Sequence, residues 1–301
     1  MRAVVLRETG DADLLRVEEV PEPEGDTIAV RAAGVNFLDV LVRQGRYPQP
    51  PPLPATPGIE VAGDVDGRRV LALLRQTGGG YAERASIDPE WVFPLPEGAT
   101  YEEGAAFLMT FLTAWIPLRH VRLAPGATVL VHAGAGGVGS AAIQVARHLG
   151  ARVVATASTE EKRELVRKLG AEEVYGYDEF TDTVRADIVL DPVGGAVFTA
   201  SLGVVNPLGT VVAVGYAAGD WEPLNTQLLV GRNVAVFGFY LGRLMRLAPG
   251  RVHEAANEVL QAWRDGALKP LVGATYPLER AADAHRLIED RRHVGKVVLV
   301  P

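Results

Sequence analysis

The sequence predicts an α/β protein in which a doubly wound parallel sheet is inserted into a β-rich domain that is split in the sequence. Up to about residue 100, short apolar and β-branched runs are bounded by Gly, Pro and Asp, which is typical of strands. From about residue 127, strands alternate with helices, and this alternation indicates parallel strands joined by crossover helices. We therefore expect a β-rich domain at 1–110 and 245–301 and a parallel α/β domain at 111–244.

The first half of the chain supplies the predicted strands of the β-rich domain, at residues 3–6, 27–33, 59–65 and 69–73. Residues 47–58 are rich in proline, so we expect an extended surface or rim loop that cannot join a central sheet. Residues 105–118 form the longest apolar stretch. It is too short to span a bilayer and is expected to be a buried helix.

The second half alternates in type along the chain. Strands are expected at 127–132, 152–157, 174–177, 187–191, 210–215 and 234–239, and helices at 140–149 and 159–169. Ser158 and Glu161 have capping-box spacing ahead of the second of these helices. The tail adds helices at 251–265 and 281–291 and a strand at 296–300.

The composition excludes several classes of function. The 30 Lys and Arg against 37 Asp and Glu give a net charge of −7, whereas binding a nucleic-acid backbone needs a basic face. The chain has no cysteine, so disulfides, thiolate zinc sites and a cysteine nucleophile are impossible. The 6 histidines show no metal-ligand spacing and are expected at the surface or at caps. The N-terminal segment turns polar early, so we expect no secretory signal and a cytoplasmic location.

A glycine-rich turn follows the strand expected at 127–132. Gly134, Gly136 and Gly139 fit G-x-G-x-x-G between a strand and a helix. In a Rossmann fold the first glycine permits the tight turn, the second lets the backbone approach a pyrophosphate, and the third lets the helix pack close to the strand. The helix N-terminus adds free N–H groups and a partial positive charge. The turn therefore predicts a dinucleotide site, the alternative being a turn whose glycines serve packing alone.

The end of the second strand indicates which dinucleotide is bound. A fold that prefers NAD usually places Asp or Glu there to hold the ribose 2′-hydroxyl, whereas residues 157–159 are Ala-Ser-Thr. The missing acid removes repulsion toward a 2′-phosphate, and Lys162 and Arg163 in the next helix could supply positive charge. The glutamates at 160–161 act in the opposite direction. The balance predicts NADPH rather than NADH.

Motifs spread over nearly the whole chain resemble those of the medium-chain dehydrogenase/reductase superfamily, in its zinc-free, zeta-crystallin-like quinone oxidoreductase branch. Singly none of them is specific, but together they are. They are AGVNFLD at 33–39, GRYP at 45–48, PGIE at 57–60, LTAW at 112–115, the glycine turn, DPVG at 191–194 and GKVV at 295–298. The resemblance implies a Rossmann domain inserted in a GroES-like catalytic domain. It also implies NADPH as the cofactor and a homodimer that pairs through the apolar edge strand at 234–239.

Zinc alcohol dehydrogenases resemble the same frame but carry metal ligands that this chain lacks. Where they use a cysteine, this chain has Asn36, and where they use the histidine of a Gly-His-Glu triplet it has Ile59. Their four-cysteine structural lobe cannot exist in a chain without cysteine. The resemblance therefore implies no metal site and a reaction without a Lewis-acid metal.

The resemblance also implies a set of site residues. The catalytic candidates are Asn36, Tyr47 and Thr113, and the cofactor-binding candidates are Gly134, Gly136, Gly137, Val138, Gly139, Ser158, Lys162, Tyr177, Val193, Val214, Gly215, Phe239 and Leu241. Structural alternatives remain, because Tyr47 could pack on the proline-rich loop, Asn36 could satisfy a turn, and Thr113 could cap a buried helix. Leu41 stands where some relatives carry a cleft tyrosine, and the loop at 65–68 is short, so the size and shape of the acceptor stay open.

Three functions are compatible with these features. The first is hydride transfer from NADPH to a quinone, with a small-molecule acceptor and no nucleic-acid or membrane partner. The second is reduction of the C=C bond of an enone or enal by the same transfer. The third is a nucleotide-binding protein without turnover. A proton for the reduced product would come from water or from a hydroxyl such as that of Tyr47, since no general acid is evident.

Overall fold

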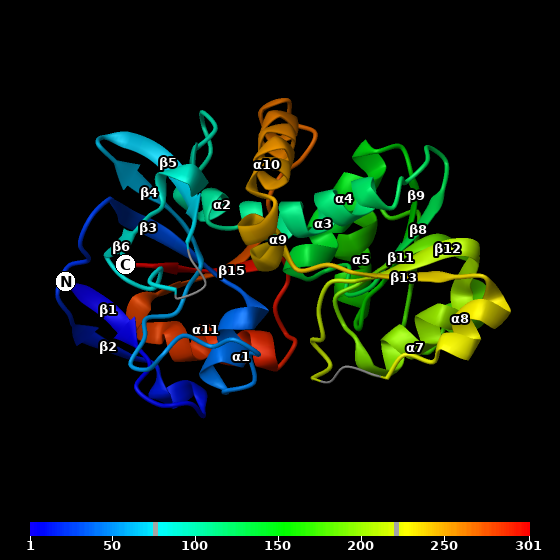
Figure 1. Cartoon of the computed structure of the whole chain (residues 1–301), viewed down its shortest axis with the longest axis horizontal. Coiled ribbons are helices and arrows are strands. Elements are labelled where there is room, and N and C mark those ends of the chain that lie inside the picture. Colours follow the sequence, from blue (N-terminus) through cyan, green and yellow to red (C-terminus); the bar gives the residue numbers. More distant parts are fainter. Residues whose placement is uncertain (75–77, 220–222) are drawn as a thin grey trace. The chain divides into compact units, whose positions relative to one another are not determined.

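The computed structural model describes residues 1–74, 78–219 and 223–301. The chain divides into two compact units, one formed by Met1–Met109 with Pro270–Pro301 and the other by Thr110–Lys269. Figure 1 shows the elements of each unit. In the described part of the chain no helix is long and apolar enough to cross a bilayer. The apolar stretch at 105–118 lies largely in helix α3 (Leu108–His120), as expected.

The α/β unit contains one sheet of six strands, in the order β10-β9-β8-β11-β12-β13. Every neighbouring pair in it is parallel. The strand order reverses between β8 and β11, which defines a doubly wound fold and confirms the predicted fold class. The strands are β8 (Thr128–Val131), β9 (Arg152–Thr156), β10 (Glu173–Tyr175), β11 (Ala186–Asp191), β12 (Val205–Ala213) and β13 (Ala235–Gly238).

Helices connect these strands and cover the sheet. Helix α4 packs on β8 and β9, α5 on β10, and α7 on β11 and β12. Helix α5 begins at a cap one residue later than predicted, because the Thr159 hydroxyl, and not Ser158, accepts from the Lys162 N–H at 3.3 Å. The helices are α4 (Gly137–His148), α5 (Glu160–Leu169), α6 (Phe180–Thr183), α7 (Gly195–Val204), α8 (Thr226–Arg232), α9 (Leu241–Leu247) and α10 (Pro249–Arg264).

The second boundary of the α/β unit lies at Lys269, later than the boundary expected after residue 244. Two contacts tie the intervening segment to the unit. The Trp115 indole N–H donates to Glu258 Oε2 at 2.7 Å, and the Lys269 N–H donates to Gln144 Oε1 at 2.8 Å. The alternation of strands and helices in the sequence ends near residue 240. The contacts that place α9 and α10 in this unit join distant residues, so no local pattern predicts them.

The β-rich unit combines the two ends of the chain in one sheet, in the order β14-β15-β3-β4-β5-β7 with β6 also paired to β3. Strand β15, from the C-terminal end, pairs antiparallel with β3, as a domain split in the sequence requires. The strands of this sheet are β3 (Thr27–Val35), β4 (Glu60–Val65), β5 (Arg68–Leu73), β6 (Arg84–Ser86), β7 (Val92–Pro94), β14 (Val272–Pro277) and β15 (Lys296–Val300). Strands β1 (Arg2–Val5) and β2 (Arg16–Glu19) form a separate antiparallel pair. The helices of this unit are α1 (Phe37–Arg43), α2 (Tyr101–Gly104) and α11 (Ala281–Glu289), with 3₁₀ turns at Ala12–Leu14, Pro89–Trp91 and Leu278–Arg280.

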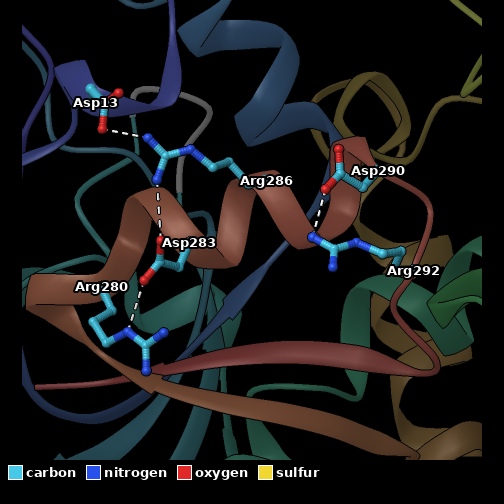
Figure 2. Close-up of polar contacts among 6 residues, drawn as sticks. All are labelled: Asp13, Arg280, Asp283, Arg286, Asp290 and Arg292. Carbon is cyan, nitrogen blue, oxygen red and sulfur yellow. Dashed lines mark hydrogen bonds and ion pairs between the residues drawn. The ribbon is translucent and has the colours of Figure 1, made fainter.

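Helix α11 carries exposed ion pairs on its solvent side. Figure 2 shows Asp283 between Arg280 and Arg286, at 2.8 and 3.1 Å, with Arg292 paired to Asp290 at 2.6 Å. All these side chains are at least 40% exposed. Such pairs add little to stability, because water screens the charges and the side chains lose freedom.

Two histidines are completely buried, which contradicts the expectation of surface or capping positions. In the α/β unit, His132 Nδ1 lies 2.9 Å from Thr156 Oγ1, and its Nε2 lies 2.8 Å from Ser201 Oγ. The Ser201 hydroxyl donates its own proton to the Val197 carbonyl, so it must accept from His132 Nε2–H. Burial lowers the pKa of this ring to about 3, so it is a neutral imidazole, and its contacts join β8, β9 and α7.

The second buried histidine belongs to a polar network in the β-rich unit. His285 Nδ1 accepts from Arg43 Nε, and its Nε2 lies 3.3 Å from the Tyr81 hydroxyl. Tyr81 in turn donates to Asp39 Oδ2 at 3.1 Å, and Arg43 Nη2 donates to Glu289 Oε1 at 2.5 Å. Every member except Glu289 is buried, so the network anchors α1 to α11 within the core.

The two buried imidazoles predict how stability depends on pH. Burial lowers the pKa of His132 and His285 to about 3, and for His285 the Arg43 charge adds to the shift. The unfolded chain takes up protons near pH 6.5 that the folded chain does not. The free energy of unfolding should therefore fall below that pH, by up to about 1.4 kcal/mol per pH unit for each imidazole. Burial raises the pKa of Asp39 to about 6, and its earlier protonation offsets part of the fall below that value.

Urea unfolding of the wild type and of His132→Gln at a series of pH values measures this slope. The free energy of unfolding of the variant should depend less steeply on pH, by the contribution of one imidazole, whatever the absolute stability of the variant. Equal slopes for the two proteins would contradict the assignment of His132 as a neutral buried group.

Candidate functional site

The carboxyl ends of the six parallel strands meet at one edge of the α/β sheet, and every predicted cofactor residue lies at or just beyond that edge. Short backbone bonds extend the ladder past the strands. Gly134 N donates to Thr156 O at 2.9 Å, Val214 N donates to Asp191 O at 2.9 Å, and Phe239 N donates to Ala213 O at 2.9 Å. The loops that follow the strands are thereby fixed side by side, in the place where doubly wound folds bind ligands.

The glycine turn passes directly from β8 into α4. Gly136 is the N-cap of the helix, and the first bond of the helix runs from Ser140 N to Gly136 O at 2.9 Å. The N–H groups of 137–139 precede that bond, and they are the orphan donors of a helix N-terminus. A Cβ atom on Gly139 would lie 2.1 Å from the Ala133 carbonyl oxygen, so only glycine allows the helix to approach the strand this closely.

Ala133, at the start of the turn, has φ of +50°, in the left-handed region that non-glycine residues avoid. Its N–H donates to the Tyr177 hydroxyl at 3.1 Å, across from the loop after β10. Residues with a strained backbone of this kind are frequent at ligand-binding sites, where contacts with their surroundings maintain the strained conformation. Tyr177 and the start of the glycine turn are thus held together, although 44 positions separate Ala133 from Tyr177 in the sequence.

The loop after β9 presents the residues predicted to read the 2′-position of a ribose. Ser158 is exposed, and Lys162 is half-buried in the first turn of α5, where burial lowers the pKa of its ammonium group. Arg163 instead pairs with Glu160 at 3.0 Å and with Glu179 at 3.5 Å. The positive charge of Arg163 therefore compensates the negative charge of Glu160, which would otherwise oppose the binding of a phosphate.

The loop after β11 is shaped by a buried carboxylate. Asp191 Oδ1 accepts from the N–H groups of Val193 at 2.7 Å and Gly194 at 3.1 Å. Burial raises the pKa of Asp191, and the two N–H bonds oppose that shift. Val193, Val214, Gly215 and Phe239 are all half-buried at this edge, whereas Leu241 is only 3% exposed and packs in the core. Leu241 therefore offers little surface to a ligand in this structure.

The three catalytic candidates fall in different units. Thr113 lies on α3 in the α/β unit and is 9% exposed. Asn36 and Tyr47 lie in the β-rich unit, where both are half-buried. Asn36 is the N-cap of α1, and its N–H donates to Asp39 Oδ2 at 2.8 Å. Tyr47 follows the same helix, with its N–H bonded to Leu41 O at 3.2 Å.

A buried ion pair beside Asn36 escaped the sequence analysis. Lys296 Nζ lies 3.1 Å from Glu60 Oε2, with exposed fractions of 5% and 1% for the two side chains, and it donates to Asn36 Oδ1 at 2.6 Å. Burial raises the pKa of Glu60, while Lys296, the Met109 N–H and the Asn36 amide favour its charged form. The motifs PGIE and GKVV carried these two residues, but no pattern in the sequence showed that they meet.

The residues at the metal positions of the zinc enzymes do not fit zinc. Ile59 has no donor atom, and Asn36 turns its oxygen toward an ammonium group that repels a cation. Among the residues that the structure describes, no three His, Cys, Asp or Glu side chains gather as a metal site would require.

Comparison with known families matches both units. Residues 23–97 match the alcohol dehydrogenase GroES-like domain, and residues 137–265 match the family described as zinc-binding dehydrogenase. The mouse quinone oxidoreductase is 31% identical over 100% of this chain and 98% of its own length. The human synaptic vesicle membrane protein VAT-1 homolog is 32% identical over 100% of this chain and 86% of its own length.

Solved structures agree with this assignment along the entire chain. The quinone oxidoreductase of Thermus thermophilus, determined alone and with NADPH, has a TM-score of 0.89 at 41% identity and full coverage of both chains. The Escherichia coli quinone oxidoreductase complexed with NADPH has a TM-score of 0.91 at 28% identity, also with 100% coverage of both chains. The chain belongs to the quinone oxidoreductase branch of the medium-chain dehydrogenase/reductase superfamily, a family of oxidoreductases, as its motifs predicted.

The glycine turn yields a prediction about packing. Gly139→Ala should destabilise the protein by about 1–3 kcal/mol, since the added methyl group meets backbone oxygen at 2.1 Å and the helix must move. Gly203 in α7 is a matched control, because an added Cβ there meets nothing within 4 Å. Gly203→Ala should raise stability by about 0.5–1 kcal/mol through helix propensity. Thermal unfolding compares the two variants, and equal stability of Gly139→Ala and wild type would refute the close approach.

Proposed function

We propose that this protein transfers a hydride from NADPH to a quinone or a related conjugated carbonyl without zinc. The observation that carries the proposal is one sheet edge, at which the glycine turn follows β8, Lys162 lies in the first turn of the helix after β9, and Tyr177 lies in the loop after β10. The relatives solved with NADPH support this choice of cofactor. The β-rich unit would be the catalytic domain that supplies the acceptor side. A cytoplasmic location stays a prediction.

The residues present fit NADP(H). The first-turn N–H groups of α4 would donate to the pyrophosphate oxygens, and Gly139 leaves open the space that a Cβ would fill. Ser158, Lys162 and Tyr177 would hold the 2′-phosphate. Half-buried residues after β11, β12 and β13 would line the nicotinamide together with Thr113. Leu241 is buried and would offer the nicotinamide little surface.

Bound NADPH would supply the hydride, so the work of the protein is orientation and exclusion of water. The catalytic candidates Asn36 and Tyr47 of the β-rich unit and Thr113 of the α/β unit are all uncharged, so none of them offers a counter-ion to a charged acceptor. We therefore expect neutral quinones to be better acceptors than carboxylated ones. Water, or the hydroxyl of Tyr47, would deliver the proton to the reduced oxygen.

Acceptor assays test the proposal directly. NADPH oxidation should be faster with 1,4-benzoquinone than with 2-alkenals, and it should survive dialysis against a zinc chelator, with elemental analysis showing no stoichiometric zinc. Deuterium at the nicotinamide distinguishes the two reductions. A hydroquinone oxygen exchanges its label with water, whereas C=C reduction leaves deuterium in a C–H bond. Retained deuterium and faster alkenal turnover would favour the enone reductase, and no consumption with any acceptor would favour a nucleotide-binding protein.

Cofactor selectivity provides a second test. Lys162→Ala removes one charge-assisted contact to the 2′-phosphate, worth about 1.5–3 kcal/mol, and should weaken NADPH binding by about one to two decades. NADH has no such phosphate and should bind nearly as before. Isothermal titration with both cofactors measures the difference. Lys168→Ala, exposed in the last turn of the same helix, removes an equal charge away from the 2′-position and is the matched control that should affect the two cofactors alike. Equal weakening of NADPH and NADH by Lys162→Ala would contradict the assignment.

The edge strand β13 supports a homodimer. Among the residues that the structure describes, strand β13 pairs only with β12, and its other edge needs a partner or a cover. We propose that a second copy pairs there. Phe237→Lys, on that strand, should shift light scattering from the mass of a dimer toward that of a monomer at micromolar concentration. A wild type that is already monomeric would refute the proposal.

A further inference from the structure

The ammonium group of Lys296 lies at the centre of a cage of oxygen atoms in the β-rich unit. It contacts Val35 O at 3.1 Å, Asn36 Oδ1 at 2.6 Å and Glu60 Oε2 at 3.1 Å. It donates hydrogen bonds to Val35 O and Asn36 Oδ1, because an ammonium group has only donors, whereas its contact with Glu60 Oε2 is an ion pair. The contact with Asn36 is the shortest of the three.

The sheet order explains how these groups meet. Strand β3 ends at Val35, directly before Asn36, and near this end it pairs with β15 on one side and β4 on the other. Lys296 begins β15 and Glu60 begins β4, so the two charges approach the end of β3 from opposite sides. A Cβ on Gly34 would lie 2.9 Å from Glu60 Oε2, and glycine therefore keeps the room in which the pair forms.

Glu60 makes the cage electrically neutral and fixes it in place. Its Oε1 atom accepts from the Met109 N–H at 2.8 Å, at the start of α3. Because both charged side chains are almost fully buried, neither one can turn to solvent without leaving the other unpaired, which is costly. Lys296 is consequently a rigid donor aimed at Asn36.

A rigid donor decides which end of the Asn36 amide faces inward. Only the oxygen can accept from Lys296, so the NH₂ group must lie on the other side of the carboxamide. That NH₂ group donates to Gly34 O at 3.3 Å and also supports the Glu60 charge. The bond to Gly34 is long compared with the 2.6 Å contact on the oxygen side. It is the bond in this cluster that is most easily exchanged for another acceptor.

We propose that Lys296 is a positioning residue that holds the Asn36 carboxamide with its oxygen inward and its NH₂ group presented to a carbonyl oxygen of the electron acceptor. The proposal rests on the proposed hydride transfer. When a conjugated carbonyl accepts a hydride, the electron pair of the C=O π system moves to oxygen, and a proton from water later neutralises that oxygen. The NH₂ group of Asn36 would exchange its long bond to Gly34 for a bond to this oxygen, and the buried charge of Lys296 strengthens it as a donor.

A double-mutant cycle on turnover tests this role. Removing Lys296 alone would leave Glu60 as an unpaired buried charge, so Lys296→Met is combined with Glu60→Gln, which keeps an acceptor for the Met109 N–H. This neutral-pair variant is compared with Asn36→Leu and with the triple variant. Arg292→Met, which removes an exposed ion pair with Asp290 just after α11 (Figure 2), is the control and should leave turnover unchanged.

We expect the losses of kcat caused by the separate changes not to multiply when the changes are combined. Asn36→Leu should lower kcat for 1,4-benzoquinone by roughly 10²-fold, the usual effect of removing one donor to a developing oxyanion. The neutral-pair variant should lose at least 10-fold through disorder of the same amide, with an unchanged KM for NADPH. The triple variant should be no slower than Asn36→Leu alone, because Lys296 then has no amide to position.

Other outcomes overturn the inference. A triple variant whose loss equals the product of the two separate losses, or a neutral-pair variant that raises the KM for NADPH at an unchanged kcat, shows a general structural role for Lys296. A wild type that consumes NADPH with neither quinones nor alkenals removes the proposed function, and the inference with it. If the wild type reduces quinones and the neutral-pair variant has the same kcat, the positioning role of Lys296 is refuted while the proposed function stands.

Discussion

The parallel alignment of six strands is the constraint on which the rest of this structure depends. It places every strand–helix loop of the α/β unit at one edge, so residues that are far apart in sequence become neighbours there. The glycine turn, the first turn of α5 with Lys162, and the loop with Tyr177 follow β8, β9 and β10, which are adjacent. Backbone bonds between these loops, and the strained Ala133, hold the edge in its shape before a ligand arrives.

Much of this arrangement could be predicted because it depends on local patterns in the sequence. Alternating strands and helices predicted the doubly wound sheet, and the spacing of Gly134, Gly136 and Gly139 predicted the cradle at its edge. Local patterns were less exact at element ends. The cap of α5 is Thr159 and not Ser158, because either hydroxyl suits the position and only backbone geometry selects one. Likewise β12 begins at Val205, earlier than expected, through a stretch with Pro207 that does not look like a strand.

Contacts between distant residues could not be predicted. The buried His132 and His285 resemble surface histidines in sequence, and only their hydrogen-bond partners on other elements show why they remain neutral in the core. The pair formed by Glu60 and Lys296 joins residues that are far apart in the sequence, and it exists because β4 and β15 flank β3. The α/β unit thus carries a local motif at its sheet edge, and the β-rich unit carries a non-local polar cluster of its own.

The most direct test of this account is a nuclear magnetic resonance titration of the backbone amides with NADPH and then with NADH. Both cofactors should shift the amides of 134–139, because both carry a pyrophosphate. Only NADPH should shift the amides of Ser158, Lys162 and Tyr177 strongly, since only it has a 2′-phosphate. Shifts confined to the opposite edge of the sheet, or identical shifts at Lys162 with both cofactors, would contradict the claim that this edge is the binding site of NADPH.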